Sequence, residues 1–151
     1  GTGTGVLLPF ILDQHPAHVT ACDLSKEMLR RAHQKFGNLV DFRQIDVVDI
    51  SPQSGQFDVV FCNACFANMY DQVNTVLAIH DLLKPSGRLV ISHPMGTDFI
   101  RQLKKDSSNL NLHEPPEDEQ EARSVLEQQG MNLMLYWNMP LLYLAIVQRS
   151  N

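Results

Sequence analysis

Apolar residues in this chain alternate repeatedly between the two-residue period of strands and the longer period of helices, and this alternation constrains the fold more than any other feature. His18–Cys22 predicts a short strand. Ser25–Phe36 predicts a helix, because Ser25 is a good N-cap, the first turn is acidic and the apolar residues form one stripe. Asp41–Ile45 predicts a second strand. Phe57–Cys62 is almost wholly apolar, which is typical of an inner parallel strand covered on both faces.

The second half of the chain continues in the same way. A helix is predicted from side chains at helical spacing, namely Val73, Val76, Leu77, His80 and Leu83. Pro85-Ser86-Gly87 is expected to end this helix before the strand Arg88–Ser92. The elements expected next are an amphipathic helix, a polar loop, a helix with an acidic first turn and two antiparallel strands: Thr97–Lys105, Ser107–Pro116, Glu117–Gln129, Met131–Met139 and Leu141–Arg149.

Strands that alternate with helices favour an α/β fold with a doubly wound, Rossmann-like sheet. We expect this sheet to be mostly parallel, with helices on both faces and an antiparallel pair of strands at the C-terminus. The 151 residues contain no internal repeat and no linker, so we expect a single domain over residues 1–151. Sheets of this kind bind their ligands at the carboxyl ends of the strands, where the strand order reverses.

Composition narrows the choice of partners. Hydrophobic residues make up 44% of the chain and charged residues 19%, which is typical of a globular protein. The net charge of −5 disfavours nucleic acid, and the longest apolar run, Leu141–Val147, is too short to cross a membrane. The odd number of cysteines, 3, argues against a disulfide framework and favours a cytoplasmic protein, although an organelle-targeting leader before residue 1 stays compatible with the sequence.

A glycine-rich loop, Gly1-Thr2-Gly3-Thr4-Gly5, stands directly before the apolar start of a helix. Glycines let such a loop turn tightly and bring backbone N–H groups close to a ligand. A dinucleotide-binding loop would carry its third glycine where this chain has Val6, so an NAD-type oxidoreductase is less favoured. The loop also lacks the Gly-Lys-Ser/Thr ending of a phosphate-binding P-loop.

Two aspartates end the first two predicted strands. Asp23 stands where a carboxylate can accept hydrogen bonds from both hydroxyls of a ribose. Asp46 stands where a carboxylate can accept a hydrogen bond from the exocyclic amine of adenine, while the N–H of Val47 meets a ring nitrogen. Each aspartate alone is also compatible with a helix cap or a solvated loop. Together, behind a glycine loop, they predict an adenosine site.

The chain resembles the class I S-adenosylmethionine-dependent methyltransferases, of the small-molecule, type 11-like kind. The stretches that carry the resemblance occur in family order: GTGTG at 1–5, VTACDLSKEML at 19–29, FRQIDVVDI at 42–50, FDVVFCNACF at 57–66 and LLKPSGRLVIS at 82–92. The family's first strand, and the acidic residue just before its first glycine, would both precede Gly1. The resemblance therefore implies that this sequence is incomplete at its N-terminus, and that the strands beside the absent one have unpaired backbone groups.

The resemblance implies S-adenosyl-L-methionine as cofactor and assigns residues to it. Gly1, Thr2, Gly3, Thr4 and Gly5 would border its methionine part, Asp23 would hold the ribose, and Asp46 with Val47 would hold the adenine. Leu24 and Met28 would pack near the adenine face, and Asn63 would lie near the methionine moiety and the methyl group.

The acceptor side is less defined by the sequence. Methyltransferases that act on nucleic-acid bases carry an Asn/Asp-Pro-Pro-aromatic tetrad after the fourth strand, where this chain has Asn63-Ala64-Cys65-Phe66. Polyamine synthases of similar fold carry an acid at this strand end, so the neutral Asn63 argues against them. A metal-dependent enzyme of the catechol type would need clustered carboxylates, and none is apparent at these strand ends. Cys62 and Cys65 form a CxxC, a spacing found in redox and zinc sites. Because Cys62 stands inside an apolar strand, a buried structural role is favoured over either of these. These features favour a small or medium-sized organic acceptor.

His93, at the end of the fifth strand of the family pattern, is the candidate general base if the acceptor must lose a proton. It is also compatible with a structural histidine bonded to its loop. Phe66, Asn68 and Tyr70 are candidates to line the acceptor pocket, and aromatic residues in such a loop are as often part of the core. Thr97–Pro116 is either a lid or a surface insertion.

The sequence thus predicts a methyltransferase that transfers a methyl group from S-adenosylmethionine by in-line displacement, mainly by positioning the two reactants. A non-catalytic adenosine-ligand binder or partner subunit with the same fold is the alternative, and an NAD-type oxidoreductase is less favoured. No nucleic acid, membrane or metal is expected as a partner, and the sequence does not fix the oligomeric state.

Overall fold

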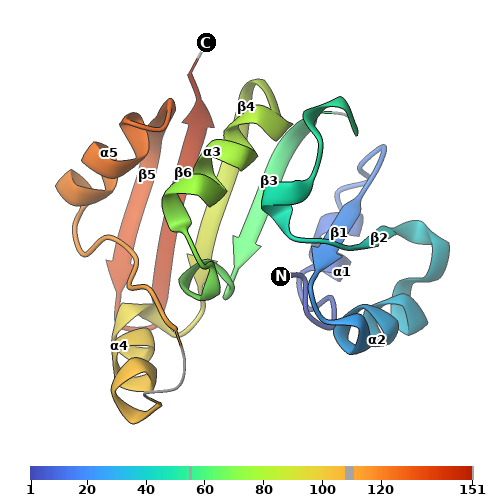
Figure 1. The fold of residues 1–151 in the computed structure, drawn as a ribbon, viewed down its shortest axis with the longest axis horizontal. Helices are drawn as coiled ribbons and strands as arrows, with labels where there is room; N and C mark the ends of the chain where they lie inside the picture. The colour runs from blue at the N-terminus through green and yellow to red at the C-terminus, as the bar shows by residue number, and fades with distance from the viewer. Residues whose placement is uncertain (55, 108–110, 151) are drawn as a thin grey trace. The chain divides into compact units, whose positions relative to one another are not determined.

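The computed structural model of the chain describes residues 1–54, 56–107 and 111–150 and has an α/β architecture (Figure 1). It consists of two compact units, residues 1–49 and residues 50–151. The single domain expected from the sequence stays a prediction. The first unit contains α1 (Leu8–Leu12), β1 (Thr20–Asp23), α2 (Lys26–Phe36) and β2 (Asp41–Gln44). The second contains β3 (Phe57–Asn63), α3 (Gln72–Leu82), β4 (Leu83–His93), α4 (Gly96–Asp106), α5 (Glu119–Glu127), β5 (Met131–Met139) and β6 (Leu142–Arg149).

The first unit is a parallel pair of strands with a capped helix between them. β1 and β2 pair in register from Thr20 opposite Asp41 to Asp23 opposite Gln44. The Ser25 hydroxyl accepts a hydrogen bond from the N–H of Met28, as the N-cap prediction requires. A small apolar core holds the unit together; it consists of Leu8, Ala21 and Val40, with Leu12, Val19, Phe36 and Phe42 packed against them.

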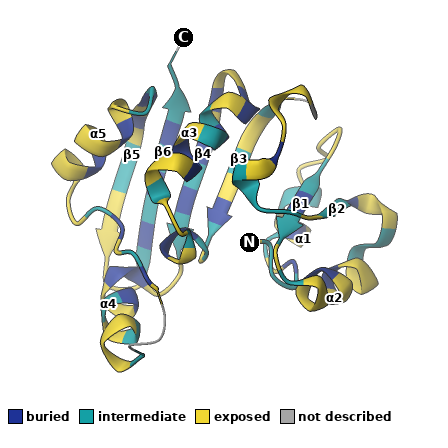
Figure 2. Ribbon diagram, viewed as in Figure 1, coloured by how far each residue is buried: buried dark blue, intermediate teal, exposed yellow. Residues whose placement is uncertain are grey.

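The second unit is a four-stranded sheet in the order β3-β4-β6-β5. β3 and β4 are parallel, whereas β6 runs antiparallel to both β4 and β5. This confirms the α/β fold class and the predicted antiparallel pair at the C-terminus. Helices α3 and α5 lie on the same face of this sheet (Figure 1). The most deeply buried side chains of these strands include Leu89, Met131, Tyr143 and Val147. Figure 2 shows buried positions along β4, β5 and β6.

β3 differs from the prediction that this strand is covered on both faces. Cys62 is buried as expected, but Val59 and Phe61 are 40% and 44% exposed. Within its sheet β3 is an edge strand that pairs with β4. Because successive side chains of a strand point to opposite faces, Val59 and Phe61 lie on the face opposite to that of the buried Cys62. An apolar run indicates a buried strand only where both faces are covered, and here one is not.

Helix α3 begins with a cap that the sequence analysis did not use, and it ends earlier than predicted. The Asp71 side chain accepts a hydrogen bond from the N–H of Asn74 at 2.9 Å, so the helix begins at Gln72. Its buried side chains are Thr75, Val76, Ile79 and Leu82, whereas Val73 and Leu77, expected in the apolar stripe, are 45% and 43% exposed. The apolar stripe predicted for this helix therefore overlaps only partly with the face that is buried in the structure.

The strand after α3 also begins earlier than predicted. β4 already starts at Leu83, so Pro85-Ser86-Gly87 lies within the strand instead of before it. This is possible because the pairing with β3 is irregular there: Phe57 stands opposite Leu83, but Val59 stands opposite Arg88. The predicted strand Met131–Met139 has the bounds of β5, and the remaining boundaries lie within two residues of their predictions. In the described ranges no helix is both long and apolar enough to cross a bilayer.

Candidate functional site

The glycine loop is fastened to the carboxyl end of β1. The N-terminal ammonium of Gly1 and the N–H of Thr2 both donate to the Cys22 carbonyl, at 2.8 and 2.9 Å. The N–H of Gly3 donates to Oδ2 of Asp23 at 2.8 Å. Gly3 and Gly5 have positive φ angles of +56° and +78°, which glycine adopts without strain. The loop predicted to approach a ligand therefore lies at the strand end where such ligands bind.

Asp23 joins the glycine loop to the start of α2. Its Oδ1 accepts a hydrogen bond from the N–H of Ser25 at 2.8 Å, while Oδ2 holds Gly3. The alternative role considered for Asp23, a local cap, is thus present in the structure. An ionised carboxylate offers about four lone-pair sites, so two stay available for the hydroxyls of a ribose. Capping and ligand binding are compatible for this side chain.

Asp46 lies shortly after the end of β2, the parallel neighbour of β1. Its Oδ1 accepts a hydrogen bond from the N–H of Val48 at 3.3 Å, and its carbonyl accepts one from Asp49 at 3.1 Å. Because the carboxyl ends of parallel strands meet at one edge, Asp23 and Asp46 belong to the same edge of this unit. Val47 begins the short 3₁₀ turn that follows.

Two large apolar side chains near Asp23 are left uncovered. Leu24 is 66% exposed and Met28 is 38% exposed. The carbonyl of Leu24 accepts a hydrogen bond from the Gln44 side chain at 3.2 Å, which ties the residue after β1 to the end of β2. Exposed apolar groups beside ribose-binding candidates are what an adenine face requires.

In the second unit, the ends of β3 and β4 are joined by polar contacts. The Ser92 hydroxyl donates to Oδ1 of Asn63 at 2.9 Å, and the N–H of Ala64 donates to the Ser92 carbonyl at 2.8 Å. Ala64 has a φ of +53°, an uncommon conformation for a residue with a Cβ. Strained residues concentrate at functional sites, so this turn is a good place for one. The sequence analysis singled out Asn63 but missed Ser92.

His93 follows Ser92 and ends β4. Its Nδ1 accepts a hydrogen bond from the N–H of Met95 at 3.2 Å, and its ring stacks on Phe99 of α4 with centroids 5.6 Å apart. Burial lowers the pKa of His93 below its ordinary value, because water stabilises the charged imidazolium better than the protein interior does. The structural alternative considered for His93, a histidine hydrogen-bonded to its own loop, is thus present in the structure. A role in catalysis stays a prediction.

The residues expected to line the acceptor pocket separate into two environments. Phe66 is buried, whereas Asn68 is exposed and Tyr70 is 87% exposed. Phe66 borders a cavity of about 140 Å³ between α3 and α5. Tyr70 borders a hollow of about 480 Å³, whose other lining residues include Gln72 and His113. The structure does not bring these three predicted residues into one pocket.

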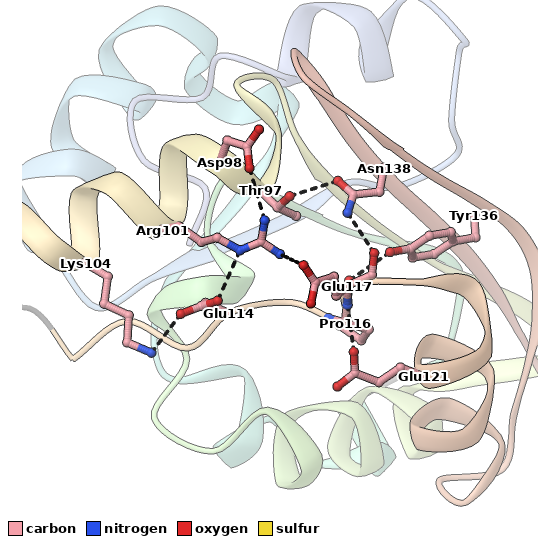
Figure 3. A network of polar contacts seen from close by, with 10 residues as sticks. All are labelled: Thr97, Asp98, Arg101, Lys104, Glu114, Pro116, Glu117, Glu121, Tyr136 and Asn138. Atoms are coloured by element: carbon pink, nitrogen blue, oxygen red, sulfur yellow. Dashed lines mark hydrogen bonds and ion pairs between the residues drawn. The ribbon is translucent and has the colours of Figure 1, made fainter.

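The segment 111–117, between α4 and α5, is anchored on several sides (Figure 3). Arg101 of α4 lies among three carboxylates, those of Asp98, Glu114 and Glu117, at 3.1, 3.4 and 2.7 Å. Lys104 adds a further ion pair with Glu114 at 3.2 Å.

Side chains of strand β5 bind backbone carbonyls of the same segment (Figure 3). The Tyr136 hydroxyl donates to the Pro116 carbonyl at 2.8 Å, and the Asn138 amide donates to the Glu117 carbonyl at 2.9 Å. The described residues at the end of Thr97–Pro116 are therefore held in place by ion pairs with α4 and hydrogen bonds from β5. Residues 108–110 of this stretch lie outside the described residues. None of these contacts has a signal in the sequence beyond the abundance of opposite charges.

Metal-binding candidates are few. Cys62 of the CxxC is buried, as expected. Within residues 1–54, 56–107 and 111–150, no three His, Cys, Asp or Glu side chains come together as a metal site would need.

Comparison with known proteins decides the family. A family model described as a methyltransferase domain matches residues 1–91. This chain belongs to the methyltransferase domain family. The resemblance found in the sequence is thereby confirmed.

Relatives of this methyltransferase domain agree with the assignment. An uncharacterized methyltransferase-like protein of Schizosaccharomyces pombe is 32% identical over 75% of this chain and 43% of its own length. A ubiquinone biosynthesis O-methyltransferase of Pseudomonas aeruginosa is 35% identical over 68% of this chain and 50% of its own length. The chain thus spans about half the length of these curated relatives.

Solved structures show the same fold. An S-adenosylmethionine-dependent methyltransferase of Mesorhizobium loti superposes with a TM-score of 0.78 at 17% identity, covering 99% of this chain and 88% of the other. Magnesium protoporphyrin IX methyltransferase of Synechocystis, solved with bound S-adenosylhomocysteine, gives a TM-score of 0.71 at 22% identity, covering 99% and 71%. At these identities the likeness concerns the fold.

Proposed function

We propose that this methyltransferase domain transfers the methyl group of S-adenosyl-L-methionine to a small or medium-sized organic acceptor. The observation that carries the proposal is the clamp between Gly3 and Asp23 at the carboxyl edge of β1 and β2. In a chain of this family, a glycine loop held there by an aspartate with unused lone pairs supports a nucleoside cofactor.

The residues of the first unit fit this cofactor chemically. The free lone pairs of Asp23 suit ribose hydroxyls, Asp46 and the N–H of Val47 suit the polar edge of adenine, and exposed Leu24 and Met28 suit its face. The glycine loop, residues 1–5, supplies backbone close to the methionine part. Asn63 is proposed to lie near the methyl-bearing end.

The bound cofactor would supply an electrophilic methyl group on a sulfonium. The work left to the chain is to hold the acceptor in line with the methyl carbon and to exclude water, because charge is dispersed in the transition state of such a displacement. Asn63, Ser92 and His93, which line the joined ends of β3 and β4, are the candidates for orienting the acceptor. Tyr70 and Asn68 are proposed to contact its outer part.

Calorimetric titration with S-adenosylmethionine and with NAD tests the cofactor. Binding of S-adenosylmethionine alone is the expected result. Val6, which takes the place of the third glycine of a dinucleotide loop and is 70% exposed, gives no support for NAD. Binding of NAD without S-adenosylmethionine would overturn the proposal.

A second experiment separates a catalyst from a binder of the same fold. Protein with a radiolabelled methyl donor is incubated with a metabolite extract, and label transferred to an organic product is measured. The alternative function, a non-catalytic adenosine-ligand binder or partner subunit, predicts cofactor binding without transfer.

A further inference from the structure

The hydrogen bonding of His93 limits what this side chain is able to do. In a neutral imidazole one ring nitrogen carries a proton and the other carries a lone pair. Nδ1 of His93 accepts the N–H of Met95, so its lone pair is on Nδ1 and the proton is on Nε2. To take a proton at Nε2 as a neutral base, the ring would need its proton on Nδ1, pointing at another N–H.

A proton on Nδ1 would point at the N–H of Met95, and the backbone around Met95 has little freedom to move that N–H away. Gly96 follows with a φ of +66°, and a Cβ on it would lie 2.6 Å from the Met139 carbonyl and 2.8 Å from that of Pro140. The start of α4 is therefore packed directly on the turn between β5 and β6. The N–H of Met95 stays aimed at Nδ1 because this turn fixes the chain on its C-terminal side.

The ring itself is kept in place by its neighbours. It stacks on Phe99, with ring planes 28° apart, and His93 stands opposite Tyr143 in the pairing of β4 with β6. Burial raises the pKa of the Tyr143 hydroxyl, so Tyr143 is neutral at physiological pH, as are Met95 and Phe99. These neighbours give the imidazole no negative charge that would favour its protonated form.

We propose that His93 serves the methyl transfer as a hydrogen-bond donor through Nε2–H, in place of a general base, and that the acceptor is an oxygen acid: a phenol, an enol or a carboxylic acid. This inference rests on the proposed function. It concerns the chemical class of the methyl acceptor, which the proposed contacts with the cofactor do not determine.

The choice of acceptor class follows from lone pairs. An oxygen nucleophile has more than one lone pair, so it is able to accept the Nε2–H of His93 and still attack the methyl carbon. A neutral amine has a single lone pair, which the donor would occupy. Met95 and Phe99, which are 46% and 41% exposed, offer apolar surface near His93 for the body of such an acceptor.

The step balances without a protein base. The acceptor loses its proton to solvent and binds as an oxyanion, which the Nε2–H stabilises. The oxygen then forms a bond to the methyl carbon while the carbon–sulfur bond breaks, and the bonding pair goes to sulfur. The sulfonium becomes a neutral thioether, and the anionic oxygen becomes a neutral ether or ester oxygen.

The tautomer is measured first, because that measurement needs neither cofactor nor acceptor. Long-range ¹H–¹⁵N spectra of the ¹⁵N-histidine-labelled chain at neutral pH distinguish Nε2–H from Nδ1–H rings, and the signals missing in His93→Gln assign His93 among the 6 histidines. Nε2–H is expected. A ring protonated at Nδ1 overturns the inference even if S-adenosylmethionine binds, whereas failure of cofactor binding overturns the proposed function and leaves the tautomer result intact.

Two variants then separate a donor from a base. His93→Gln keeps an N–H donor and cannot act as a base, and it should retain kcat/KM within about tenfold. His93→Phe keeps a ring against Phe99 and removes the donor; loss of a hydrogen bond to a charged oxygen should lower kcat/KM by about 10- to 100-fold. Equal losses in both variants overturn the donor role.

The acceptor class is tested with radiolabelled S-adenosylmethionine and a panel of substituted phenols, carboxylic acids and primary amines. Label should enter the oxygen acids, and the rise of kcat/KM with pH should move with the pKa of each phenol. Label in amines alone, no label in any compound, or a rise at one fixed pH for every phenol overturns the assigned class.

Discussion

At the scale of single residues, Asp23 connects the glycine loop with the proposed nucleoside site. One carboxylate oxygen fixes Gly3, the other fixes Ser25, and the spare lone pairs face no partner among the described contacts. A side chain that shapes the loop also presents the acceptor groups that a ribose needs.

Asp23→Ala should weaken binding of S-adenosylmethionine by about 2–3 kcal/mol, because it removes hydrogen bonds to a charged group. Calorimetric titration measures the change in Kd. Asp13→Ala is the matched control, since Asp13 is an exposed carboxylate at the end of α1, and it should leave Kd unchanged. An unchanged Kd for the Asp23 variant would count heavily against the ribose-binding role.

Gly5→Ala should destabilise the fold more than Gly37→Ala does. Both glycines have positive φ, so both variants carry the backbone cost of about 1 kcal/mol. At Gly5 the new Cβ would also lie 2.7 Å from a ring carbon of Phe36, whereas at Gly37 nothing lies within 4 Å. Overpacking of this kind adds about 1–3 kcal/mol.

Urea unfolding of both glycine variants measures the difference. Equal losses of unfolding free energy would show that the loop moves away from Phe36 without cost, and the tight packing of the loop on α2 would then be wrong.

At the scale of elements, the segment 111–117 depends on Arg101. Its guanidinium bridges three carboxylates on two parts of the chain, and Lys104 holds Glu114 as well. The Lys104 ammonium, through its hydrogen bond, keeps the pKa of the Glu114 carboxyl below its ordinary value. Because this pKa is lowered by folding, the stabilisation is present above the unfolded pKa and is lost as the pH falls through the folded one.

Arg101→Gln should free this segment for limited proteolysis and lower stability by about 1–2 kcal/mol, since several weak ion pairs are lost together. Arg123→Gln removes two exposed ion pairs on α5 and is the control, with a smaller effect and no new cleavage between α4 and α5. The difference between the variants should shrink at high salt and below about pH 4. Cleavage that is identical in both variants would contradict the anchoring role.

Local signals in the sequence predicted the elements well and their surroundings less well. The N-cap at Ser25 and the strand–helix alternation depend on neighbouring residues, so the sequence contains them. The exposure of Val59 and Phe61 depends on what covers a sheet face, which no local pattern reports. The contact of Ser92 with Asn63 depends on the register of β3 with β4, and the bond between Met95 and His93 depends on the turn packed behind Gly96.

At the scale of the whole molecule, the family match spans residues 1–91, which includes all of the first unit and part of the second. The resemblance drawn from short motifs therefore identified the family across both units. The acceptor residues stay predictions, because within one fold many substrates are served by different side chains at the ends of the strands.

The central claim, a nucleoside cofactor at the carboxyl edge of β1 and β2, is tested most directly by an NMR titration of the ¹⁵N-labelled chain with S-adenosylhomocysteine. The largest shifts are expected at the amides of Gly3, Leu24 and Val47, with saturation at one equivalent of ligand. Shifts that leave these three amides unchanged, or no shift at saturating ligand, would contradict it.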